Sequence, residues 1–319
     1  MQTLSRRTMV RGSLASAAVL IGGPVDFVRA ADAVRVGSKD FAESIILGEM
    51  YALLLEEAGL SVERKLNLGG TVIAHQALLS DELDIYPEYT GTGLLVVLES
   101  SVDAALSAEG SPVAGAADTA DAVYAYVRDE YLSEFDLVWL DRTPMSNSQA
   151  LAVRRSFAEE HDLATISDLV ALSSDVDLTF SAPVDFEERD DGLRGLQQVY
   201  GEFDATVNGV APGIKYRALM DCDANVVLAF STDAEIAIND LVVLTDDKGL
   251  WPPYNVAPVV RQAAIEANPV IPEVLNALAP LITNDVMIAL NGQVIGDDGL
   301  EPEAVAREFL IGQGLIAAG

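Results

Sequence analysis

The stretch AVRVGSKDFAESIILGEMYALLLEEAG, residues 33–59, predicts the class of the fold. AVRVGS is typical of a short strand, and the residues after it place apolar side chains on one helical face. Asp40 followed by Glu43 resembles a capping box at the start of that helix, and Gly59 is suited to end it. A strand followed at once by an amphipathic helix is the repeating unit of a parallel sheet with helical crossovers.

The same alternation continues along the chain. SVERKLNL predicts a second strand, and LDIYPEY predicts a third that Pro87 stops. Residues 100–118 are poor in large side chains and indicate a loop or surface insertion, after which a helix is expected over 119–132. FDLVWL predicts a strand that ends at Asp141, and a second block of alternation extends to about residue 239.

These blocks predict an α/β fold of two lobes with a ligand cleft between them. Residues 31–141 and 240–319 are expected to form the first lobe, and residues 142–239 the second. Clefts between domains, at the carboxyl ends of strands, are common sites for small ligands.

The charge of the chain limits its partners. Among 319 residues, 50 are acidic and 19 are basic, which gives a net charge of −31. This balance excludes a nucleic-acid partner, because phosphate backbones are bound by Lys and Arg. The acidic residues are spread along the sequence, and we interpret them as a surface adapted to concentrated salt, with added solubility as the alternative.

The N-terminal residues predict export. SRRTMVR, residues 5–11, has a twin-arginine pattern, a short apolar stretch follows, and Val28-Arg29-Ala30 is suited to cleavage. We expect residues 1–30 to be a twin-arginine signal peptide and the mature protein to be periplasmic or otherwise extracytoplasmic. No later stretch approaches the roughly 18 apolar residues of a membrane span, so no transmembrane segment is expected in the mature chain.

The sequence lacks the common catalytic and metal-binding motifs. It has no Walker A, HExxH, GxSxG, CxxC or EF-hand pattern, so we expect no enzyme activity, cofactor or metal site. Cys222 is the single cysteine, which excludes an intrachain disulfide, and we interpret it as a small buried hydrophobe. Asp84 and Glu88 are interpreted as solvated acids at a strand end rather than as a catalytic pair. An enzyme built on the same scaffold is the alternative from a different class.

Six motifs resemble those of a known family. They occur in the order VGSKDFAESIILGEM, KLNLGGT, DIYPEYTGTG, FEERDDGLRGLQQVYG, FSTDAEI and LVVLTDDKGLWPPYN. Together they resemble the substrate-binding proteins of osmoprotectant ABC transporters, the glycine betaine/choline/carnitine binders of the quaternary-amine type. The resemblance covers residue 33 to the end. It implies a two-lobed periplasmic-binding-protein fold, type II-like, that closes around a small zwitterionic or cationic ligand and delivers it to an ABC permease.

The resemblance also implies a ligand site. A trimethylammonium group cannot donate hydrogen bonds, and aromatic faces hold it at about 0.5–2 kcal/mol per ring. The carboxylate at the other end of such a ligand suits Arg or Lys together with a hydroxyl group. The matching positions are the rings Tyr89, Phe230 and Tyr254, the cations Lys39 and Arg189, and the polar residues Thr92, Asn147 and Gln149. Tyr86 faces the other side of the strand from Tyr89 by alternation, and we assign it to packing.

Two positions depart from the family's pattern. Phe230 stands where the family usually has a tyrosine, which keeps the aromatic face. Gln149, in SNSQALAV, stands where a tyrosine is common, and the missing ring could cost one to two decades in affinity. The alternative is a ligand with groups that Gln149 can hydrogen-bond, such as ectoine, an amino acid or a less-methylated amine. Arg189 lies among four acidic residues, which leaves a surface ion pair as its alternative role.

Overall fold

The computed structural model describes residues 33–107, 119–211, 214–296 and 299–318. The predicted signal peptide, residues 1–30, and most of the predicted insertion lie outside these described residues.

The described residues form two five-stranded mixed sheets. The first has the strand order β2-β1-β3-β10-β4, in which β1 is parallel to β2 and β3, and β10 is antiparallel to β3 and β4. Its strands are β1 (Val34–Gly37), β2 (Val62–Lys65), β3 (Ile85–Tyr89), β4 (Leu137–Trp139) and β10 (Val256–Arg261).

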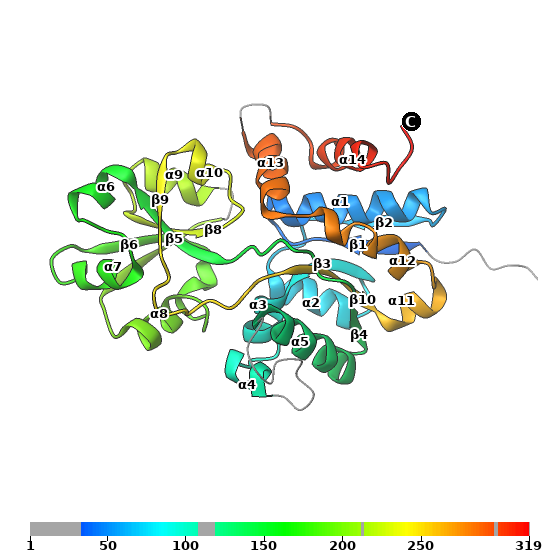
Figure 1. The fold of residues 1–319 in the computed structure, drawn as a ribbon, viewed down its shortest axis with the longest axis horizontal. Helices are drawn as coiled ribbons and strands as arrows, with labels where there is room; N and C mark the ends of the chain where they lie inside the picture. Colours follow the sequence, from blue (N-terminus) through cyan, green and yellow to red (C-terminus); the bar gives the residue numbers. More distant parts are fainter. Residues whose placement is uncertain (1–32, 108–118, 212–213, 297–298, 319) are drawn as a thin grey trace, which may run out of the picture. The chain divides into compact units, whose positions relative to one another are not determined.

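Helices cover both faces of the first sheet (Figure 1). On one face, one apolar cluster joins the sheet to α1 (Ala42–Glu57), α12 (Ile271–Asn276), α13 (Asn284–Ile295) and α14 (Pro302–Gly312). On the other face, a second cluster joins it to α2 (Thr71–Leu79), α4 (Val102–Ser107) and α5 (Thr119–Phe135). Tyr89 belongs to the first cluster and Tyr86 to the second, as strand alternation predicts.

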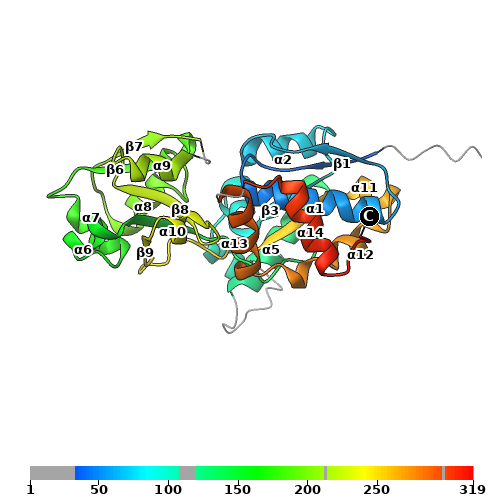
Figure 2. The ribbon, with the colours of Figure 1, turned by 90° about the horizontal axis from the view of Figure 1, so that it is seen from above.

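The second sheet has the order β7-β6-β8-β5-β9 and repeats the pattern of parallel strands closed by antiparallel ones (Figure 2). Its strands are β5 (Gln149–Arg154), β6 (Leu178–Ala182), β7 (Ala205–Gly209), β8 (Val226–Phe230) and β9 (Leu241–Leu244). Its flanking helices are α6 (Arg155–Glu160), α7 (Ile166–Leu172), α8 (Leu193–Tyr200), α9 (Lys215–Met220) and α10 (Glu235–Ile238). Shorter elements complete the fold: α3 (Thr90–Thr92), η1 (Gly93–Val97), η2 (Val184–Glu187), α11 (Gln262–Ala267) and η4 (Ala279–Leu281).

Pro87 does not stop β3, contrary to the prediction. It lies inside the buried strand, directly opposite Pro258 of β10. Arg261 donates its backbone N–H to the Asp84 carbonyl oxygen (3.0 Å), and such bonded pairs alternate along an antiparallel ladder. The Pro87–Pro258 pair therefore falls at a position where neither residue needs an N–H to bond the other strand.

Two segments connect the sheets, and hydrogen bonds join these segments to each other. Residues 140–148 lead from β4 to β5, and residues 245–255 lead from β9 back to β10. Ser146 and Asn255 form an isolated antiparallel bridge, and Asn255 Nδ2 donates to the carbonyl oxygens of Thr143 (3.1 Å) and Met145 (3.0 Å). Since β9 pairs with β5, lobe limits drawn from sheet membership fall after Leu244 rather than after Asn239.

No single helix within the described ranges is long and apolar enough to cross a membrane. One bent pair, Ile271–Leu281 with Asn284–Ile295, meets those criteria by length and composition only, across a bend of 94°.

Candidate functional site

A cavity of about 740 Å³ is lined by residues from elements of both sheets. This volume lies within the range of about 300–1,000 Å³ found for small-molecule sites. All eight residues singled out in the sequence line the cavity: Lys39, Tyr89, Thr92, Asn147, Gln149, Arg189, Phe230 and Tyr254.

Phe41 also lines the cavity, and the three rings predicted from the sequence are held there in different ways. Tyr89, at the end of β3, donates its hydroxyl to Glu43 Oε1 (2.8 Å), and Lys39 Nζ lies 5.1 Å from its ring centroid. Phe230, at the end of β8, has Lys215 Nζ 4.2 Å from its centroid. Two of the three rings therefore already face a lysine ammonium of the chain itself.

Tyr254 and Gln149 belong to a buried polar group around Asp191. Tyr254 donates its hydroxyl to Asp191 Oδ2 (3.2 Å), and Gln149 Nε2 donates to Asp191 Oδ2 (2.6 Å) and to the Tyr254 hydroxyl (3.3 Å). Gln149 therefore occupies the space beside Tyr254 with an amide that is already bonded to the protein.

Each cation at the cavity forms an ion pair. Lys39 Nζ lies 2.5 Å from Glu88 Oε1, and Lys215 Nζ lies 2.8 Å from Asp233 Oδ2. Burial lowers the pKa of Lys39, and the charge of Glu88 opposes this shift. Because Glu88 is fully buried, removing Lys39 would leave an uncompensated charge, at a cost of about 3–5 kcal/mol.

Arg189 combines the two roles that the sequence left open. Its Nε lies 2.6 Å from Asp191 Oδ1, and its Nη1 lies 3.2 Å from Asp185 Oδ2, so it is ion-paired. It also lines the cavity. Burial lowers the pKa of its guanidinium, but the hydrogen bonds that Arg189 donates to Asp191 and the charge of Asp191 outweigh this effect, so the pKa stays above the ordinary value.

The interpretation of Asp84 and Glu88 as solvated acids is wrong. Both are buried, because β3 is a central strand covered on both faces. Asp84 pairs with Arg35 (2.7 Å) and Arg261 (3.2 Å), while Glu88 pairs with Lys39. Neither carboxylate lines the cavity, so they do not form a catalytic pair there.

Glu43 is the centre of a hydrogen-bond network that the sequence reading missed. Its carboxylate accepts hydrogen bonds from Tyr89 Oη (2.8 Å), Asn147 Nδ2 (2.8 Å), Thr232 Oγ1 (2.6 Å) and Asn291 Nδ2 (3.3 Å). Burial raises the pKa of Glu43, and the four donated bonds oppose that rise. The network connects α1 of the first sheet with the turn that follows β8 of the second.

The predicted capping box of α1 is therefore wrong. The residue that caps the helix is Phe41, which makes no side-chain capping bond, and Glu43 directs its carboxylate into the network instead. The sequence does not distinguish a glutamate that caps the first helical turn from one whose carboxylate enters a buried network. The residues around Glu43 therefore did not predict its role.

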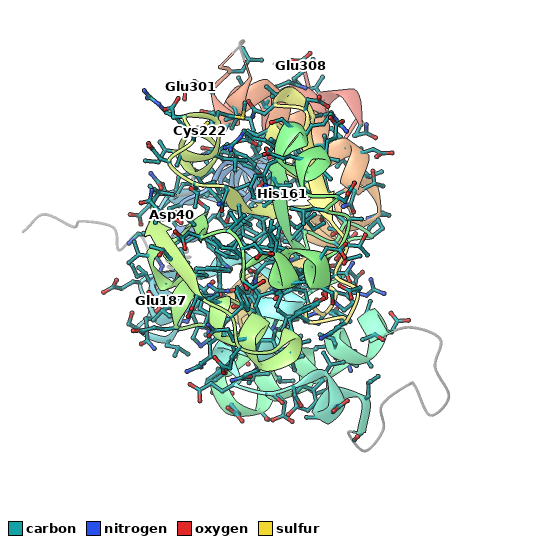
Figure 3. The ribbon with its side chains drawn as sticks, turned by 90° about the vertical axis from the view of Figure 1, so that its left-hand side faces the viewer. Asp40, His161, Glu187, Cys222, Glu301 and Glu308 are labelled. Carbon is teal, nitrogen blue, oxygen red and sulfur yellow. The ribbon has the colours of Figure 1, made fainter. Side chains whose placement is uncertain are left out.

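Cys222 and His161 do not form a catalytic arrangement. Cys222 is exposed in the turn after α9, contrary to the interpretation as a buried hydrophobe. Figure 3 shows the two labelled residues at separate positions, Cys222 in the turn after α9 and His161 in the turn after α6. Within the described residues, no group of three or more His, Cys, Asp or Glu side chains is placed to hold a metal ion.

A family model described as "Substrate binding domain of ABC-type glycine betaine transport system" matches residues 32–312. The chain is 31% identical over 291 residues to the glycine betaine-binding protein YehZ of Escherichia coli K12, covering 89% of this chain and 91% of that protein. It is 32% identical over 283 residues to a Helicobacter pylori (strain G27) protein named ergothioneine transport permease/ergothioneine binding protein EgtU. That match covers 88% of this chain but 47% of the relative, so the chain spans about half of that protein's length.

Solved structures show the same fold. A structure described as a glycine betaine/carnitine/choline ABC transporter has a TM-score of 0.66 and 29% sequence identity, covering 88% of this chain and 99% of that one. The two mixed sheets and the cavity between their elements are therefore the architecture of this group of binding proteins, as the sequence predicted.

Proposed function

We propose that the chain, which belongs to the family of substrate-binding domains of ABC-type glycine betaine transport systems, captures a quaternary-ammonium compatible solute for an ABC permease. As a member of that family, it is a substrate-binding protein of the glycine betaine/carnitine/choline type. We further propose which ligand it binds, which residues hold that ligand, and that it has no enzyme activity.

One observation supports the ligand class more than any other. The cavity gathers aromatic rings, two lysines and an arginine from elements of both sheets. A zwitterion with a methylated ammonium group and a carboxylate needs both kinds of group, an aromatic face at one end and a cation at the other. We assign Tyr89, Phe230 and Tyr254 to the ammonium end and Lys39, Arg189 and Thr92 to the carboxylate end, with Asn147 and Gln149 as polar neighbours.

A second candidate is a solute with N–H groups, such as ectoine, an amino acid or a less-methylated amine. It is favoured by Gln149, which provides an amide where a ring would complete the cage, and by Lys215, whose ammonium already faces Phe230. An enzyme on this scaffold is a weaker candidate, because Lys39, Arg189 and Lys215 at the cavity are engaged in ion pairs.

The proposal is tested by titrating the mature protein with glycine betaine, choline, carnitine and ectoine in low and in molar salt. Trp251 is a suitable fluorescence reporter, since its Nε1 donates to the Asp191 carbonyl oxygen (2.8 Å) beside the cavity. Saturable binding is expected for a methylated ligand, weakened about tenfold or more in Tyr254→Ala and in Arg189→Ala.

Arg194→Ala is the matched control for Arg189→Ala. Arg194 is an exposed arginine paired with Asp190 (2.6 Å) and does not line the cavity, so this variant should bind as the wild type does. Binding of ectoine alone would favour the second candidate, and no binding of any methylated ligand in either salt would contradict the proposal.

We further propose that ligand binding favours a closed state, since contacts from elements of both sheets are complete only when those elements approach each other. We also propose that residues 1–30 direct export by the twin-arginine route and that the acidic surface is adapted to brine. Replacement of Arg6 and Arg7 by Lys should retain the precursor inside the cell, and unchanged export would contradict this assignment.

A further inference from the structure

Two buried amides at the cavity share one carboxylate. Asn147 lies before β5 and Asn291 lies on α13, and both residues line the cavity and are at least nine-tenths buried. Asn147 Nδ2 donates to Glu43 Oε1 (2.8 Å), and Asn291 Nδ2 donates to Glu43 Oε2 (3.3 Å). The two amides are therefore held in place by the same acceptor.

These bonds fix which way each amide points. Asn291 Nδ2 also donates to the Thr232 carbonyl oxygen (3.0 Å), an atom that can only accept, so its amide nitrogen must face that side. Asn147 is held by a carboxylate that accepts three further hydrogen bonds. The amide nitrogens face the network, and the amide oxygens face away from it.

Both amide oxygens lack a hydrogen-bond partner among the described residues. Asn147 Oδ1 and Asn291 Oδ1 are buried acceptors without a donor, and Glu235 Oε2, from another residue that lines the cavity, is a third. Leaving buried acceptors unsatisfied is costly, so a ligand that supplies a donor gains affinity there and one without a donor does not. A fully methylated ammonium group has no N–H to supply.

We propose that Asn147 and Asn291 form a donor-selective subsite, which favours quaternary-ammonium ligands that also carry an O–H or N–H group. This inference rests on the proposed function and refines its ligand class. Glycine betaine would leave both oxygens unpaired, whereas a hydroxylated relative would satisfy one of them.

Pairs of ligands that differ by one donor test the inference. Carnitine and γ-butyrobetaine differ by a single hydroxyl, and in the O-methyl ether of choline a methyl group replaces the hydroxyl hydrogen. Calorimetric titration of the wild-type protein should show about tenfold tighter binding for the member of each pair that has the donor.

Variants then assign the preference to the two amides. Asn147→Ala and Asn291→Ala should each reduce the carnitine to γ-butyrobetaine affinity ratio toward one. Thr232→Ala is the matched control, because it removes one hydrogen bond to Glu43 without removing an unpaired acceptor, and it should keep the wild-type ratio. The carnitine to γ-butyrobetaine affinity ratio cancels any effect of a variant that weakens both ligands equally. Asn291→Ser replaces Asn291→Ala if the alanine variant does not fold.

The outcomes separate this inference from the proposed function. Equal affinities within both ligand pairs in the wild-type protein would overturn the inference and leave the proposed function standing. A ratio that persists in both asparagine variants would overturn the assignment to these residues. If the protein binds no methylated ligand, the proposed function and this refinement of it are both overturned.

Discussion

Gln149 is the residue at which the proposed aromatic cage would lack a ring. It pairs in register with Phe230 across the β5–β8 ladder, so a ring at this position would lie beside one that is already present. Its amide instead donates to Asp191 and to the Tyr254 hydroxyl.

Gln149→Tyr should therefore tighten the binding of glycine betaine. One added ring contributes about 0.5–2 kcal/mol, which corresponds to roughly 2- to 30-fold in affinity. Gln149→Leu is the control, because it adds apolar volume without an aromatic face and should bind no more tightly than the wild type. Calorimetry measures the affinity of both variants for glycine betaine. An equal increase in affinity in the two variants would show that side-chain volume rather than the aromatic ring is responsible.

The eight residues at the cavity were predictable because each lies in, or at a position matched to, the motifs that carry the family resemblance and has a chemistry suited to a zwitterion. They did not reveal Glu43, Asn291 or Lys215, which also line it. Asn291 reaches the network from α13, far along the chain, through contacts that local sequence does not encode. Lys215 is buried beside Phe230 and Asp233, although a lysine at a helix start is ordinarily solvated.

At the scale of elements, the packing of α2 against α5 depends on a buried histidine. The ring of His75 lies 5.6 Å from that of Tyr131 and 5.1 Å from that of Phe135, both in edge arrangements. Its Nδ1 has no partner within the described residues. Burial lowers the pKa of His75 below the ordinary 6.5, so the folded protein holds this ring neutral at neutral pH.

His75→Phe should weaken the dependence of stability on acid. Because the pKa of His75 is lower in the folded state, its contribution is present above about pH 6.5 and is lost as the pH falls toward the folded value. The free energy of unfolding of the wild type should fall more steeply between pH 7 and pH 5 than that of the variant, by at most about 1.4 kcal/mol per pH unit. Urea unfolding at pH 5, 6 and 7 measures the difference, and parallel curves would contradict this account.

The long helix α1 was predictable from its length and its helix-forming residues, although the predicted single apolar face is wrong, because nearly every residue from Glu43 to Leu55 is buried. Two of the errors came where two strands jointly decide the outcome. Pro87 breaks a strand when considered alone, but opposite Pro258 in an antiparallel pair it is compatible with the ladder. Likewise, LVVL, residues 241–244, follows the second block of the sequence, and its pairing with β5 places it in the second sheet.

At the scale of the whole molecule, the net charge of −31 sets the response to salt. The labelled Asp40, Glu187, Glu301 and Glu308 all lie at the periphery (Figure 3), and like charges at that density repel one another in the compact state.

Raising NaCl from about 0.1 M to 1 M shortens the screening length from about 10 Å to 3 Å and should raise the melting temperature by several degrees. KCl should act equally at the same ionic strength, since screening does not depend on the identity of the cation. Differential scanning fluorimetry in both salts measures the effect. A melting temperature independent of salt would mean that local ion pairs already neutralise the repulsion.

The position of β10 has a consequence for the order in which the protein can be made. This strand is inserted between β3 and β4, yet it follows the entire second sheet along the chain. In the described ladders β4 pairs with β10 alone, so β4 has no neighbour until residue 261 has left the ribosome. During synthesis the second sheet can therefore be completed before the first, and a chain that stalls between them would carry a finished second sheet and a first sheet that still lacks β10.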